Sequence, residues 1–174
     1  MEKTEKTNIY IDMANLYAEC RRKDIVLNFE SMFNWLKDKY KSDHIYIFTG
    51  YLEKYVNHYY ANEAIGYKYV FKEAVFNIDE NKIKANCDVD IAIHGTLDTI
   101  ENNLKKALLI SSDGDFLSLL KFWISREVKV AILSPADPNK CSYLLKKDNI
   151  PITYLKQVID RFTNEKALDE DETS

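Results

Sequence analysis

Two aspartates stand one residue apart in "LLISSDGDFLSLL", which spans residues 108–120. A run of aliphatic residues precedes Asp113 and another follows Asp115, so a buried strand and a core-facing helix would hold both carboxylates in place. The local pattern fits a helix start, because Ser112 and Asp115 form an S-x-x-D capping box and the helix dipole favours acidic residues there. A functional site is the alternative.

Further carboxylates come at other predicted element ends. Asp12 closes the first predicted strand, and Asp88 opens a predicted helix. If these two converge with Asp113 and Asp115 at one sheet edge, pairs about 5 Å apart repel by roughly 3 kcal/mol at an effective dielectric near 20. Such a cluster must bind protons or a cation. Oxygen ligands without His or Cys favour Mg²⁺ or Mn²⁺, which serve in phosphodiester hydrolysis.

Polar residues beside these aspartates have two interpretations each. Asn15 either caps a helix or holds a metal-bound water or a phosphate. Ser111 either bonds the local backbone or positions a carboxylate. His94 follows Asp90 by four residues, which favours a hydrogen-bonded pair on a helix over a catalytic role.

Basic and aromatic residues could contact a polyanion. Arg21, Lys82 and Lys84 lie near the acidic segments and could steer one. A group of tyrosines could stack on unpaired bases, but their helical spacing favours a packed helix face; these are Tyr51, Tyr55, Tyr59, Tyr60, Tyr67 and Tyr69.

Periodicity predicts alternating strands and helices that would position these groups. Strands are expected at residues 8–13, 44–51, 67–76, 107–111, 128–134 and 151–155. Helices are expected at 14–23, 28–40, 51–63, 87–100, 116–123, 139–148 and 156–162. This alternation predicts an α/β three-layer sandwich with a central, mostly parallel sheet flanked by helices. Ligands bind such sheets at the carboxyl ends of the strands, where the strand order reverses.

Length and composition indicate an ordinary globular protein. The 174 residues are 46% hydrophobic and 30% charged, with a net charge of −4 that reflects an acidic C-terminus. We expect an N-terminal extension at 1–7, one domain at 8–163 and a disordered acidic tail at 164–174. No apolar run approaches the roughly 20 residues of a membrane helix, and no signal peptide is visible, so a cytoplasmic location is expected. Three scattered cysteines indicate neither disulfides nor zinc.

Four segments together resemble the NYN domain, a branch of the PIN-like metal-dependent nucleases, and in particular its uncharacterised bacterial group. They are "IYIDMANL" (9–16), "KANCDVDIAIHGTLD" (84–98), "LLISSDGDFLSLLKF" (108–122) and "VKVAILSP" (128–135). The resemblance covers roughly residues 8–150 and keeps the family order of motifs. It implies a PIN-like sandwich whose acidic pocket binds Mg²⁺ or Mn²⁺ and cleaves RNA.

The resemblance also assigns site residues. It implies catalytic and metal-binding roles for Asp12, Asp88, Asp113 and Asp115. It matches Asn15 to the family asparagine and Ser111 to the small hydroxyl residue. With these we group Ser112, Asp90 and Lys84 as residues expected to bind substrate or to position the carboxylates; the family pattern gives Asp90 no set role, and Lys84 is included because it lies near Asp88 in the sequence. Ser112 and Ala85 stand where the family commonly has Gly, and since both are small we expect an altered loop rather than a lost site.

The leading hypothesis is therefore a metal-dependent ribonuclease that cuts RNA, either internally as an endoribonuclease or from an end. The alternative is an adaptor that keeps the acidic pocket but acts by binding RNA or protein. A receiver-like phosphotransfer domain would need an Asp after a middle strand, and "FTGY" at residues 48–51 offers none. RNA is the expected partner, no membrane contact is expected, and a homodimer is left open.

Overall fold

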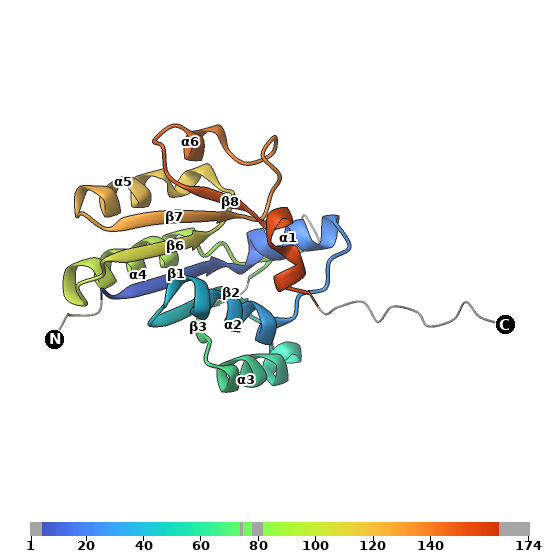
Figure 1. The fold of residues 1–174 in the computed structure, drawn as a ribbon. Coiled ribbons are helices and arrows are strands. Elements are labelled where there is room, and N and C mark those ends of the chain that lie inside the picture. The colour runs from blue at the N-terminus through green and yellow to red at the C-terminus, as the bar shows by residue number, and fades with distance from the viewer. Residues whose placement is uncertain (1–4, 74, 78–81, 164–174) are drawn as a thin grey trace.

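A six-stranded parallel sheet forms the centre of the molecule in a computed structural model that describes residues 5–73, 75–77 and 82–163 (Figure 1). The strands lie in the order β3-β2-β1-β6-β7-β8. Their bounds are β1 (Thr7–Asp12), β2 (His44–Tyr51), β3 (Lys68–Glu73), β6 (Lys106–Ile110), β7 (Lys129–Ser134) and β8 (Ile152–Tyr154). The expected parallel sheet is confirmed, with β8 at its edge. The expected tail at 164–174 lies outside the described residues.

The order of strands reverses between β1 and β6. From β1 the chain moves outward to β2 and β3, and then returns to place β6 on the other side of β1. In sheets of this type the ligand-binding crevice lies at such a switch point, outside the carboxyl ends of the strands, which here are β1 and β6. Asp12 ends β1, and Ser111 directly follows β6, so the fold brings two predicted site segments to the switch point.

Helices cover both faces of the sheet and complete three layers (Figure 1). One face packs against α1 (Met13–Arg22), α2 (Phe29–Tyr40) and two 3-10 turns, η3 (Leu155–Gln157) and η4 (Ile159–Arg161). The other face packs against α4 (Asp88–Glu101), α5 (Leu117–Ser125) and the single-turn α6 (Tyr143–Lys146). The 3-10 turn η1 (Glu53–Tyr55) leads into α3 (Val56–Ile65), which packs against α2 and β3.

Burial on both faces explains the apolar strands. Every residue of β1 is buried, with Ile9 and Ile11 in one core and Tyr10 in the other. Successive side chains of a strand point to opposite faces, so a central strand needs apolar residues at nearly every position. The three cysteines are buried and unpaired.

Trp123 joins α5 to α4. Its side chain is fully buried, and its Nε1–H donates to the carbonyl of Gly95 at 3.1 Å. A Cβ at Gly95 would lie 2.5 Å from Trp123 Cζ2, so the close helix contact requires glycine. We expect Trp123→Phe to lower the free energy of unfolding by about 1–3 kcal/mol, because it removes this hydrogen bond and leaves a small void. Urea denaturation measures the loss, and an unchanged midpoint would contradict it.

Three predicted elements differ from the structure. The helix expected at 139–148 is only the single turn α6 (Tyr143–Lys146). The strand expected at 67–76 ends at Glu73, and β4 (Val75–Asn77) instead pairs antiparallel with β5 (Lys82–Lys84) in a separate two-stranded sheet. Apolar and aromatic residues continue through 75–76, so the pattern carries no sign of the break. The helix expected at 156–162 is the pair of turns η3 and η4, because Val158 has φ −132° and ψ 7°, outside the helical region.

No helix in the described part of the chain is both long enough and apolar enough to cross a membrane.

Candidate functional site

Asp12 is held rigidly at the end of β1. Its side chain accepts the backbone N–H of Asn15 at 3.1 Å, and so caps α1. The second carboxylate oxygen accepts the Ser111 hydroxyl at 3.0 Å. The Asp12 side chain is buried, so these two bonds fix its orientation. Ser111 also accepts the N–H of Asp113 at 3.2 Å, and thus meets both of the roles considered for it.

Asn15 ties the two sides of the crevice together. Its Oδ1 accepts the backbone N–H of Ser112 at 3.0 Å. The Asn15 side chain is therefore not the cap of α1, since Asp12 fills that position. The bond holds the first turn of α1 against the loop after β6, which bears Asp113.

The prediction that Ser112 caps the following helix is wrong. The Ser112 hydroxyl is buried and faces β7, where its oxygen lies 3.1 Å from Ser134 Oγ and accepts the N–H of Ala136 at 2.8 Å. Asp113 takes the cap instead, and accepts the Asp115 N–H at 2.9 Å at the start of the 3-10 turn η2 (Gly114–Phe116). The spacing in the sequence is compatible with a cap at Ser112 or at Asp113. Asp113 is the cap because the Ser112 hydroxyl bonds to Ser134 and Ala136 instead.

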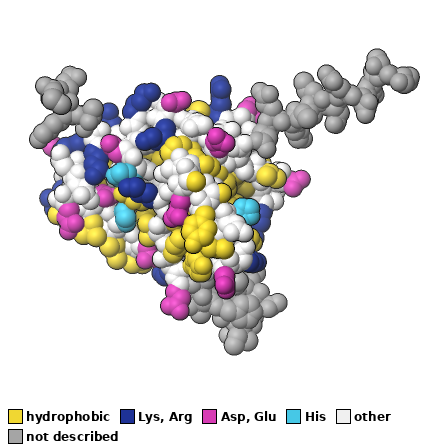
Figure 2. Space-filling view, turned by 90° about the horizontal axis from the view of Figure 1, so that it is seen from below, with side chains coloured by type: hydrophobic (Ala, Val, Ile, Leu, Met, Phe, Trp, Pro, Cys, Tyr) yellow, Lys and Arg dark blue, Asp and Glu magenta, His cyan; other side chains and the backbone are white. Residues whose placement is uncertain are grey.

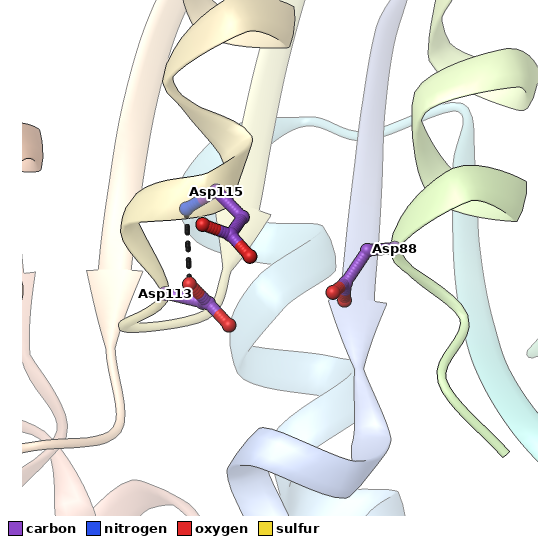
Figure 3. A group of neighbouring side chains, drawn as sticks. All are labelled: Asp88, Asp113 and Asp115. Atoms are coloured by element: carbon purple, nitrogen blue, oxygen red, sulfur yellow. Dashed lines mark hydrogen bonds between the residues drawn. The ribbon is translucent and has the colours of Figure 1, made fainter.

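Three carboxylates converge across the crevice. Asp88, Asp113 and Asp115 each offer a carboxylate oxygen, and these oxygens lie within 4.8 Å of one another. Asp113 and Asp115 come from the turn before α5, and Asp88 points toward them from the start of α4 (Figure 3). Asp88 and Asp113 are half-buried and Asp115 is exposed, so the group opens to solvent. An ion or a phosphate can therefore reach it.

The carboxylates destabilise one another's charges. Burial raises the pKa of Asp12 to about 6, the nearby charges of Asp88 and Asp113 add to the rise, and the bonds from Asn15 and Ser111 oppose it. Burial also raises the pKa of Asp88, and the charges of Asp113 and Asp115 contribute. A site with this electrostatics gains free energy from a proton or a cation.

The donor set fits a hard divalent cation. Three carboxylate groups supply oxygen alone, and no His or Cys belongs to the group among the described residues. Oxygen ligands suit Mg²⁺ and Mn²⁺, which keep several waters and bind one or two carboxylates together with phosphate oxygens. Asp12 lies outside the group of three, although its charge is coupled to Asp88 and Asp113.

Asp90 does not belong to this group. Its carboxylate lies 3.2 Å from the ammonium of Lys72, which also donates to the Asn86 carbonyl at 2.7 Å. The expected partner of His94 differs too, because its Nε2 lies 3.9 Å from Asp98 and its ring packs edge-on against Tyr46. His94 thus has a structural environment, as expected, but with another carboxylate.

The proposed basic residues are only partly placed. Lys82 and Lys84 belong to β5, which leads toward α4, but their side chains lie outside the description. Arg21 is in the last turn of α1, where it lines a groove.

Sequence reasoning missed this groove. It has a volume of about 700 Å³ and is lined by α1, the start of α2, the end of β2, the segment 52–62 and Ala85. Its residues come from distant segments, so no local motif marks it. Figure 2 looks from below, where α3 lies in Figure 1, and shows hydrophobic side chains gathered in the middle of that face.

The tyrosines divide between the core and this surface. Tyr59 and Tyr67 are buried, as the packing interpretation predicted. Tyr51, Tyr55 and Tyr60 are exposed.

Comparison with known proteins gives a shared fold and a family. A crystal structure of a protein of unknown function from Vibrio parahaemolyticus has a TM-score of 0.75 with 19% identity, over 93% of this chain and 98% of that one. This likeness shows a common fold. No curated protein matches the sequence. The NYN domain pattern matches residues 6–155, a range that contains the three converging carboxylates and Asp12. The chain therefore belongs to the NYN domain family.

Proposed function

We propose that this protein is a metal-dependent ribonuclease that hydrolyses phosphodiester bonds within RNA. The observation that carries the proposal is the convergence of Asp88, Asp113 and Asp115 at the switch-point crevice of an NYN domain. The family is associated with PIN-like nucleases, and an acidic cluster open to solvent suits a reaction on a phosphate. RNA is preferred over DNA as the substrate because of that family membership.

The four aspartates would have different roles according to where they lie. Asp88, Asp113 and Asp115 would hold Mg²⁺ or Mn²⁺, which would orient a water, raise its acidity and offset the charge of the phosphate. Asp12 lies outside this group but is coupled to the charges of Asp88 and Asp113, and with its orientation fixed by Ser111 and Asn15 it would accept a hydrogen bond from a water at the cluster. Asn15 and Ser111 position these groups and need not touch the substrate.

Cleavage assays on a mixed panel of single-stranded and hairpin RNAs test the proposal. We expect cleavage with Mn²⁺ or Mg²⁺, none with excess EDTA, and little by Asp12→Asn or Asp113→Asn. If the wild type and both variants degrade RNA equally, the activity belongs to a contaminant and the proposal fails. Binding of RNA without cleavage under any metal would indicate the adaptor function instead.

Metal uptake can be measured apart from cleavage. We expect isothermal titration with Mn²⁺ to show a binding site that is lost in Asp113→Asn, because the variant removes one of three converging charges. An adaptor need bind no metal at these carboxylates. Equal uptake by the wild type and the variant would show that the ion binds elsewhere.

A further inference from the structure

The lining of the groove of about 700 Å³ includes residues that adjoin Asp12 and Asp88 in the sequence or in the sheet. Met13, which lines it, is bonded to Asp12 along the chain, and Ala85 lines it three residues before Asp88. Thr49 and Gly50 contribute the end of β2, just past Phe48, which pairs with Asp12 in the sheet. A chain molecule whose phosphate lies at the cluster would therefore have its neighbouring atoms at the groove.

Aromatic rings form much of the groove wall. The rings come from α1, α2, η1, α3 and β3, and belong to Tyr17, Phe29, Tyr55, Tyr59 and Tyr69. Tyr59 and Tyr69 pack on each other with ring centroids 5.1 Å apart. Tyr17 and Tyr55 are each 43% exposed, so their rings keep surface that the protein itself does not cover. Flat rings that are partly exposed are suited to a flat ligand, although the Lys54 ammonium lies over the Tyr55 ring at 4.9 Å from its centroid.

The charge of the groove is opposite to that of the cluster. Among the described residues that line it, none is Asp or Glu, whereas Arg21 and His58 supply basic groups. The neighbouring site presents three carboxylates within 4.8 Å of one another. This division fits a ligand that is both flat and anionic, with a ring on the tyrosines and a phosphate near Arg21 other than the one at the cluster. An apolar peptide would make no use of the basic groups.

We propose that this groove binds an unpaired base of single-stranded RNA, next to the phosphate at the acidic cluster. The volume lies within the roughly 300–1,000 Å³ of small-molecule sites. In a duplex the bases are stacked on one another and cannot enter the groove, so the groove would select unpaired segments of RNA. The choice of RNA rests on the proposed ribonuclease function, but the stacking itself needs no metal.

Fluorescence anisotropy with a labelled 12-nucleotide RNA in EDTA tests the groove without cleavage. We expect Tyr17→Leu and Tyr55→Leu each to weaken binding about tenfold, since leucine keeps apolar volume but cannot stack. Tyr17→Phe should bind like the wild type. The matched control is Tyr60→Leu, because Tyr60 is an exposed tyrosine of α3 that does not line the groove. It should stay within about twofold of the wild type. Melting curves of all variants check folding.

The outcomes separate this inference from the proposed function. If the wild type cleaves RNA, but Tyr17→Leu and Tyr55→Leu bind and cleave normally, the groove assignment is overturned and the ribonuclease stands. If both variants lose binding while the wild type cleaves nothing with any metal, the groove assignment stands and the ribonuclease fails. A wild type that binds a hairpin duplex as tightly as the single strand also overturns the groove assignment.

Discussion

Replacing Asp113 or Asp88 by asparagine should lower kcat/KM for RNA cleavage by at least about a hundredfold. Each change removes one of the three carboxylates that lie together, so the site holds its cation less tightly and positions the phosphate less well. Steady-state cleavage at a fixed Mn²⁺ concentration measures the effect. Raising the Mn²⁺ concentration should restore part of the activity, because weaker affinity is overcome by mass action.

A matched control is available near the amino end of β2, whereas the aspartates of the site lie at the carboxyl ends of the strands. Asp38 is an exposed carboxylate near the C-terminal end of α2, beside Lys37, which donates to the Ser42 carbonyl before β2 begins. Asp38→Asn makes the same chemical change and should keep kcat/KM within about twofold of the wild type. Equal losses in Asp38→Asn and Asp113→Asn would show that net charge, and not the cluster, is responsible.

Asp12→Asn should make the metal-free protein more stable at pH 8 by about 1–3 kcal/mol. Burial raises the pKa of Asp12 from 3.8 to about 6, so ionising this carboxyl costs more in the folded protein than in the unfolded chain. A raised folded pKa contributes stability that is complete below about pH 4 and lost as the pH rises through 6. Asparagine stays neutral and avoids that loss, while its amide oxygen can still accept one of the two hydrogen bonds.

Urea denaturation in EDTA between pH 4 and pH 8 measures this difference. The two proteins should have similar unfolding free energies at pH 4, and the variant should gain between about pH 4 and pH 6 and keep a constant advantage from there to pH 8. The same variant should be nearly inactive on RNA. The Asp12 carboxylate would then be required for activity although it lowers the stability of the folded protein. A variant less stable than the wild type at pH 8 would contradict the argument, because the ionised carboxylate would then be stabilising.

Much of the fold follows from patterns that are local in the sequence. The run Ala107–Ile110 is apolar at every position because β6 is buried on both faces, and the alternation of such runs with amphipathic helices predicts a parallel sheet. The separate sheet of β4 and β5 could not be predicted in the same way. Aromatic residues continue across residue 74 with no Gly or Pro to mark the end of β3.

The sequence predicted which residue types form the site better than it predicted their hydrogen bonds and ion pairs. Aspartates at element ends indicated an acidic edge, since parallel strands end on the same side of the sheet. The direction of Ser112 depends on Ser134 and Ala136, which are distant in sequence, so the local capping pattern predicted the wrong bond. Asp90 follows Asp88 by two residues in the first turn of α4, yet its carboxylate pairs with Lys72 of β3 and is not part of the group.

Diffraction from a crystal soaked in Mn²⁺ tests the central claim most directly, because the anomalous signal of manganese locates the ion itself. We expect an anomalous peak between the carboxylates of Asp88, Asp113 and Asp115, at about 2.0–2.3 Å from their oxygens. The same soak of Asp113→Asn should lose the peak or weaken it strongly. Manganese bound elsewhere, or none at this cluster at a concentration that supports RNA cleavage, would contradict the assignment of these aspartates as the metal site.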